Sequence, residues 1–204
     1  MKKIVEYIKG RYDPLSVIVY GSFADGSNNE HSDFDALVIV KDGEKLHDVS
    51  FVNEIQLDVF VYPVSYFKND FDCAEIIQIF DGKIIMDSDG VGEKLKERVN
   101  GYLESLPYKK TAKENREQVE WCKKMLLRAK RKDAEGMFRW HWLLTESLEI
   151  YFDLLGKMYF GPKKSLRYMK ENQSAAFELY SAALQNLDYG VLERWIGFLD
   201  SVAE

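Results

Sequence analysis

The sequence predicts an α+β protein, in which a small mixed β-sheet domain precedes an all-helical bundle. Up to about residue 90, short apolar runs rich in Val, Ile and Phe alternate with Gly, Asn and Asp, as strands separated by turns do. Beyond that point, apolar residues recur every three to five positions, which favours α-helices. A chain of 204 residues is long enough for one large domain or two small ones. We expect two domains, residues 1–90 and residues 91–204.

The first half begins with a helix and continues with strands and turns. Ile4, Val5 and Ile8 share one face of that helix. Four apolar runs then follow as strands, and helical spacing returns between the third and the fourth, over 66–80. Helices placed before and between strands are expected to cover the faces of their sheet. The strands are expected at 17–20, 34–40, 55–62 and 83–86.

The second half carries the start signals of several helices. Thr111 and Glu114 have the spacing of a capping box, in which each side chain accepts from the other residue's backbone N–H. Ser174 and Asp188 are residue types that cap helix N-termini. Pro107 separates the first two helices. The predicted helices cover 91–106, a segment from Thr111, about 133–159, and segments from Ser174 and Asp188.

Composition limits the classes of function. With a formal net charge of -6 and a pI near 5.3, the molecule repels a phosphate backbone, so a large nucleic acid is not an expected partner and a cationic small molecule suits it better. No apolar run approaches the roughly 20 residues that span a bilayer, and no signal pattern is present, so we expect a soluble, cytoplasmic protein. Cys73 and Cys122 form neither a ligand cluster nor a disulfide framework. An aromatic content of 14% is compatible with a monomer or a homodimer.

The segment 109–132 is strongly basic, with ten Lys and Arg residues against three Glu residues. Charge runs on helices are usually solvated faces. This one could instead meet a nucleic acid or a triphosphate, and both interpretations stay open.

Three aspartates occupy positions in otherwise apolar strands. Asp33 and Asp35 open the strand at 34–40 and point to one face, because residues two apart in a strand do so. Asp58 interrupts the strand at 55–62, so the three carboxylates converge if these strands are neighbours. Such a cluster resists ionisation unless a cation neutralises it. Oxygen ligands on a partly open site suit Mg²⁺, and two ions about 3.5–4 Å apart would stabilise both oxygens of an in-line displacement at phosphorus.

Gly21 and Ser22 directly follow the first strand. A Gly at this place lets backbone N–H groups approach a phosphate, and the Ser22 hydroxyl adds a donor. Gly26 and the run 27–29 then close a loop back to Asp33. Taken singly, a Gly-Ser pair is usually a turn and an Asp-x-Asp pair an exposed strand end. Their order along the chain and their place on predicted strands favour a functional site.

This combination resembles the nucleotidyltransferase superfamily of DNA polymerase beta type. The motif comprises Gly21-Ser22, Gly26 and Ser32-Asp33-Phe34-Asp35 entering an apolar strand, with Asp58 on a later strand, within roughly residues 15–62. The resemblance implies an enzyme that transfers a nucleoside monophosphate from a nucleoside triphosphate, with ATP favoured, and releases pyrophosphate. It implies Asp33, Asp35 and Asp58 as catalytic carboxylates and Mg²⁺ ligands, and Gly21, Ser22 and Ser32 as nucleotide-binding residues. Asp25 stands where many members carry Arg or Lys, so Lys163 of the helical half is assigned to the triphosphate.

The layout of the helical half is similar to that of the aminoglycoside and lincosamide nucleotidyltransferases, whose helical domain helps to bind the acceptor. This likeness implies a small hydroxylated acceptor, cationic if aminoglycoside-like, and a role in antibiotic resistance. On the helix at 133–159, Trp142 and Glu146 lie away from the apolar stripe. We expect Glu146, rather than Glu149 or Glu120, to be the general base, and His141 to be a core or boundary residue.

Two alternatives stay open. An enzyme of the antitoxin kind could nucleotidylate a protein or RNA, with the basic segment 109–132 beside the metal site. The chain could also be a catalytically inactive nucleotide-binding module, although the presence of Asp33, Asp35 and Asp58 weighs against this.

Overall fold

The computed structural model describes residues 1–68, 70–106, 109–131 and 133–203. The chain forms two compact units, Met1–Leu106 and Pro107–Glu204. The division lies after Leu106 rather than after residue 90, because helix α3 (Val91–Ser105) packs against the sheet unit. Lys96 Nζ donates to the Gly82 carbonyl at 2.6 Å, which fastens α3 to the segment before the last strand. The expected separator, Pro107, lies outside the described residues.

The first unit contains the mixed sheet that the sequence predicts, in the order β3-β5-β2-β1-β6. β1 runs antiparallel to β2 and β6, whereas β2 and β5 are parallel. Two short strands were not predicted, because their sequences show no alternation of apolar and polar residues. Their apolar residues, such as Leu46 and Phe51, are exposed in the structure. One of them, β3, is antiparallel to β5, and the other, β4, also pairs with β5. The strands are β1 (Ser16–Val19), β2 (Phe34–Val40), β3 (Leu46–Asp48), β4 (Phe51–Val52), β5 (Ile55–Pro63) and β6 (Lys83–Asp87).

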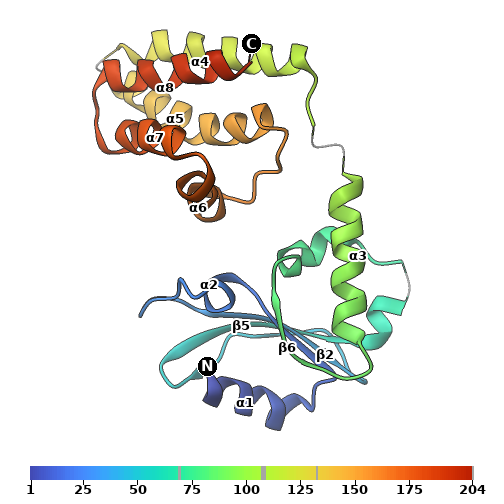
Figure 1. The fold of residues 1–204 in the computed structure, drawn as a ribbon. Helices are drawn as coiled ribbons and strands as arrows, with labels where there is room; N and C mark the ends of the chain where they lie inside the picture. Colours follow the sequence, from blue (N-terminus) through green and yellow to red (C-terminus); the bar gives the residue numbers. More distant parts are fainter. Residues whose placement is uncertain (69, 107–108, 132, 204) are drawn as a thin grey trace. The chain divides into compact units, whose positions relative to one another are not determined.

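Helices cover both faces of this sheet (Figure 1). Helix α1 (Lys2–Tyr12) packs Ile4 and Ile8 against one face. The other face packs against α3 and two 3₁₀-helices, η1 (Val64–Lys68) and η2 (Cys73–Ile79). The helical spacing expected over 66–80 is therefore present, but as two short helices, the second kinked at Ile76.

A buried carboxylate ties α1 to the edge strand β3 of the sheet. Asp48, at the end of β3, accepts hydrogen bonds from the hydroxyls of Tyr12 at 2.6 Å and Tyr7 at 3.2 Å. The Ser50 hydroxyl and backbone N–H also donate to it. Burial opposes ionisation, but the hydrogen bonds, led by that of Ser50, hold the pKa of Asp48 below its ordinary value.

The second unit is a bundle of helices, as expected. The capping box of Thr111 and Glu114 is present at the start of α4, and Asp188 accepts from the Val191 N–H at 3.0 Å at the start of α8. Ser174 is not the N-cap of α7: it is the first residue of the helix, the N-cap is Gln173, and the Gln173 side chain makes no capping hydrogen bond. α6 was not predicted, although a proline in its first turn is a helix start signal. The helices are α4 (Ala112–Ala129), α5 (Ala134–Leu154), α6 (Pro162–Asn172), α7 (Ser174–Gln185) and α8 (Tyr189–Ala203).

The bundle core is mostly apolar but contains a chain of buried hydrogen bonds. Trp195 is fully buried, and its Nε1–H donates to Ser147 Oγ at 2.9 Å. The Ser147 hydroxyl in turn donates to the Leu144 carbonyl at 3.1 Å, which also accepts from Tyr180 at 2.8 Å. These bonds connect α5 with α7 and α8. Among the residues that the structure describes, no helix has the length and apolar character needed to cross a membrane.

Candidate functional site

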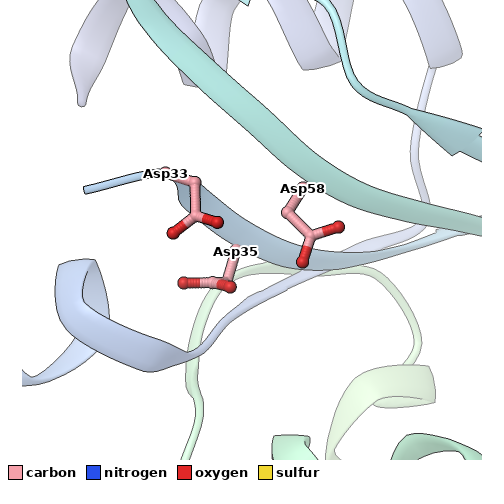
Figure 2. Close-up of side chains that lie close together, drawn as sticks. All are labelled: Asp33, Asp35 and Asp58. Carbon is pink, nitrogen blue, oxygen red and sulfur yellow. The ribbon is translucent and has the colours of Figure 1, made fainter. Parts of the chain in front are cut away.

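Three aspartates converge on one face of the sheet, as the sequence predicts. The parallel register of β2 and β5 places Asp35 opposite Asp58, and Asp33 directly precedes β2. One carboxylate oxygen from each lies within 4.8 Å of the others. Figure 2 shows the three side chains lying close together. Asp33 is exposed, and Asp35 and Asp58 are half-buried.

Strand alternation explains this arrangement. Phe34 and Leu57 are buried in the core under α1, so their neighbours point to the opposite face. Asp35 shares that opposite face with Leu37, and Asp58 shares it with Phe60. The carboxylates thus stand at the margin of the face that α3, η1 and η2 cover.

A glycine directly contacts the aspartate cluster. Gly21 begins α2 (Gly21–Asp25) with φ 64°, a left-handed conformation that side chains rarely adopt. A Cβ atom at this position would collide with the Asp35 carboxylate. The Tyr20 N–H donates to the Asp35 carbonyl at 3.1 Å, which fixes the strand end beside it. Only glycine fits here without displacing Asp35.

The segment after Gly21 is more ordered than the loop that the sequence suggests. It forms the short helix α2, in which Ser22 is buried. The following turn is held by side chains: Ser32 Oγ accepts from the Asn29 N–H at 2.9 Å, and Asn29 Oδ1 accepts from the His31 N–H at 2.9 Å. The Ser32 side chain therefore shapes the loop that leads to Asp33.

His47 is a site residue that sequence reasoning missed. Its Nε2 lies 2.5 Å from Asp58 Oδ1, and its ring stacks on Phe60 with centroids 4.2 Å apart and an interplanar angle of 4°. His47 belongs to β3, which was not predicted, so nothing in the sequence placed it next to β5. An isolated His between Leu46 and Asp48 gives no signal of this kind.

Tyr20 is a second residue near the aspartates that was not singled out. Its side chain is buried at the end of β1. Burial is the largest cause that raises the pKa of its hydroxyl; a hydrogen bond with Gln78 acts the other way, and the nearby carboxylates of Asp58 and Asp35 raise it further. A neutral phenol therefore lies close to the carboxylate cluster at ordinary pH.

The donor set fits a hard divalent cation. All three groups are carboxylates, and their oxygens lie close enough for one ion to reach one from each. Three carboxylates at this spacing repel one another when ionised, and a bound cation relieves that repulsion. The cluster can therefore hold a metal ion.

Glu146, the expected general base, lines a cavity of about 510 Å³ in the helical unit. The cavity lies between α4 and α5 and is predominantly acidic. Trp142 is outside its lining but is 41% exposed, as expected, and stands edge-on to Trp121 with ring centroids 5.5 Å apart. The lining residues are Lys110, Glu114, Glu117, Gln118, Trp121, Glu146, Glu149 and Ile150.

The other predicted residues of the helical unit lie on its surface. Lys163 is exposed in the first turn of α6, and Glu120 is exposed on α4. His141 was expected in the core or at its boundary, but it is exposed, because the buried face of α5 runs through its neighbours Trp140 and Leu143. The expectation for His141 was therefore wrong: the residue directly follows the buried Trp140 but lies outside the buried face of the helix.

Several side chains of the basic segment are paired with acids. Lys110 Nζ lies 2.6 Å from Asp153, and Lys123 Nζ lies 2.7 Å from Asp200. Arg131 pairs with Asp133 at 2.5 Å. Lys132 lies outside the described residues. These pairs support the interpretation of the segment as a solvated, ion-paired face.

Comparisons with known proteins extend these observations. The family model of the nucleotidyltransferase domain matches residues 1–116 of the 204. No curated protein matches the chain. A crystal structure of a toxin-antitoxin with AMP-PNP is similar at 14% identity and a TM-score of 0.34, over 50% of this chain and 86% of that one. A nucleotidyltransferase-like protein from Exiguobacterium sibiricum 255-15 is similar at 13% identity and a TM-score of 0.36, over 99% of this chain and 72% of that one.

Proposed function

The chain belongs to the nucleotidyltransferase domain family, and from this premise we propose that it transfers a nucleoside monophosphate from a nucleoside triphosphate to a hydroxyl of a small cationic molecule. Pyrophosphate is the leaving group. The observation that carries the proposal is the convergence of Asp33, Asp35 and Asp58 beside the glycine turn at Gly21. Carboxylates from neighbouring strands, placed next to a backbone turn that can approach phosphates, are suited to phosphoryl chemistry.

Asp33, Asp35 and Asp58 are the residues that would hold Mg²⁺, and two ions are the expected number. When bound, such ions neutralise charge on the triphosphate and polarise the reacting oxygens. Transfer of this kind depends mainly on positioning and charge stabilisation. The fixed register of β2 and β5 supplies that positioning, because two of the three ligands come from directly opposed strand positions.

Other residues of the sheet unit orient the nucleotide. Gly21 leaves space for a phosphate to approach the backbone beside Asp35. Ser22, at the same turn, would donate its hydroxyl, and Ser32 would act by holding the loop before Asp33. Lys163 of the helical unit would pair with the triphosphate as an exposed cation.

The acceptor would bind in the acidic cavity between α4 and α5. Four glutamates and one lysine line it, so it attracts cations, and the Trp121 ring offers a surface for cation–π contact. Its volume of about 510 Å³ suits a small molecule. Aminated, hydroxylated antibiotics of the aminoglycoside or lincosamide kind are the acceptors we propose, with modification as a means of resistance. Glu146 would take the proton of the attacking hydroxyl.

A protein or RNA acceptor has less support. Such a partner would use the basic segment 109–132, yet Lys110, Lys123 and Arg131 are paired with acids. A cation that is already paired contributes less to binding a polyanion.

Pyrophosphate release tests the proposal. The native chain would be incubated with Mg²⁺ and each of the four nucleoside triphosphates, against a panel of aminoglycosides and lincosamides. We expect release that depends on the acceptor, is lost in Asp33→Ala, and persists in Asp42→Ala, which removes an exposed carboxylate in the turn after β2. Triphosphate binding without release on any small acceptor would contradict the proposed acceptor class. Release that persists in Asp33→Ala would contradict the assignment of the site.

A further inference from the structure

We propose that His47 is a positioning residue that fixes the orientation of the Asp58 carboxylate at the aspartate cluster. The inference rests on the proposed function, because the role of Asp58 there is that of a carboxylate that would hold Mg²⁺. His47 is not itself placed among the metal ligands.

The position of the His47 ring is set by β3 and β5. In the antiparallel register, His47 is opposite Phe60, and the two rings stack in nearly parallel planes at 4.2 Å. Phe60 and Asp58 are two residues apart on β5, so they project from the same face. The stack therefore holds the His47 Nε2 atom against Asp58.

The contact between His47 and Asp58 has the length of a short hydrogen bond. Nε2 lies 2.5 Å from Asp58 Oδ1. An ionised carboxylate only accepts hydrogen bonds, so the imidazole must carry its hydrogen on Nε2 and donate it. This occupies Oδ1 on one side and leaves the other acceptor positions of Asp58 for the site that it shares with Asp33 and Asp35.

Asp58 needs such a partner. Its side chain is 35% exposed, so packing alone does not restrain the carboxylate. The terminal torsion of an Asp side chain has a broad energy profile, and a hydrogen bond to one oxygen selects a single orientation. Partners of this kind, one step away from a metal, orient the ligand, and their loss typically lowers metal affinity by about 10- to 100-fold.

The chain offers a matched control in His31. That imidazole is exposed in the loop before Asp33, and its Nε2 lies 3.5 Å from Glu30 rather than beside an aspartate of the cluster. Replacing His31 removes the same chemical group from the same unit and leaves the contact with Asp58 in place. His47 is 45% exposed, so substitutions at both positions are expected to fold.

Binding of Mn²⁺ alone, followed by electron paramagnetic resonance on the full chain, tests the inference without any turnover. His47→Phe keeps an aromatic ring on Phe60 and removes the donor, whereas His47→Gln keeps an N–H donor near the position of Nε2. We expect Mn²⁺ affinity to fall about tenfold in His47→Phe, to recover most of that loss in His47→Gln, and to be unchanged in His31→Gln. A thermal unfolding curve of each variant verifies that it is folded.

Each other result overturns a specific statement. Native affinity in His47→Phe would overturn the positioning role and leave the proposed function intact. Equal losses in His47→Phe and His47→Gln, with ¹⁴N coupling to Mn²⁺ in the native chain, would replace positioning by direct ligation through the imidazole. A native chain that binds no Mn²⁺ would overturn the proposed function, and the inference with it.

Discussion

Asp35 and Asp58 lie directly opposite each other in the parallel register of β2 and β5. Along the chain, β2 and β5 are separated by the two short strands β3 and β4. The register therefore brings two carboxylates together where neither is local to the other in sequence. Unneutralised, they repel each other, so the fold tolerates this pair at a cost that a bound cation would remove.

Gly21 should be irreplaceable beside this pair. In Gly21→Ala, the new methyl group meets the Asp35 carboxylate and the residue must adopt a left-handed conformation. We expect a loss of about 1–2 kcal/mol in unfolding free energy for the conformation alone, together with weaker Mn²⁺ binding. Urea unfolding and Mn²⁺ titration measure the two effects.

Gly10→Ala is the matched control. Gly10 lies in α1, and a Cβ atom there would meet nothing within 4 Å. Alanine in an exposed helix should stabilise the chain by roughly 0.5–1 kcal/mol. A Gly21→Ala variant that behaves like Gly10→Ala would contradict the proposed contact with Asp35.

Glu146→Gln should reduce turnover while acceptor binding is retained. The substitution keeps the shape of a residue that lines the acidic cavity but removes its basicity. Loss of a general base typically lowers kcat by about 10²- to 10⁴-fold. Steady-state kinetics would separate kcat from KM, with Glu149→Gln as the comparison. A larger fall of kcat in Glu149→Gln would transfer the role of base to Glu149.

Trp121→Ala should weaken acceptor binding rather than slow the reaction. The Trp121 ring lines the cavity, so its removal deletes a surface for a cationic acceptor. We expect KM for the acceptor to rise about tenfold, with kcat nearly unchanged. Phe138→Ala serves as a control, because Phe138 is 67% exposed and outside the cavity lining. An equal effect of both substitutions would argue against a binding role for Trp121.

Asp48 should make the stability of the fold depend on pH. Burial opposes ionisation of Asp48, but hydrogen bonds from Ser50 and Tyr12 outweigh it and lower the pKa of the carboxyl in the folded chain. The ionised carboxylate therefore contributes fully to the unfolding free energy above the unfolded pKa of about 3.9. This contribution is lost as the pH falls through the folded pKa. We expect Asp48→Asn to lower the unfolding free energy by about 1.5–3 kcal/mol at pH 7. The difference from the native chain should shrink below about pH 4.

Urea unfolding at a series of pH values measures that difference. Asp42→Asn, at an exposed carboxylate in the turn after β2, should change little. A deficit in Asp48→Asn that stays constant down to pH 2.5 would contradict a role for the ionised carboxylate.

The sequence is informative where periodicity is strong. Asp35 and Asp58 stand within buried strands and Asp33 directly precedes the first of them, so the sequence predicts their convergence on the condition that the two strands are neighbours, and the structure supplies that pairing. His47 could not be placed in this way, because β3 has three residues and two of them, Leu46 and His47, are exposed. Its pairing with Phe60 depends on tertiary contacts that a short polar segment does not encode.

The boundary between the two units, after Leu106 rather than after residue 90, could not be predicted from hydrophobic periodicity either. The apolar stripe of α3 predicts a helix, but does not indicate whether Leu95 and Val99 pack on a sheet or on a bundle. They pack on the sheet. α6 was not predicted, although Pro162 suits the first turn of a helix.

The central claim is that the three aspartates bind a nucleoside triphosphate through a divalent cation. Calorimetric titration of ATP into the full chain, with Mg²⁺ and then with a chelator, tests this claim most directly. We expect binding that requires Mg²⁺, is lost in the isosteric variant Asp35→Asn, and persists in Asp42→Asn. Binding that survives the chelator, or that is unchanged in Asp35→Asn, would contradict it.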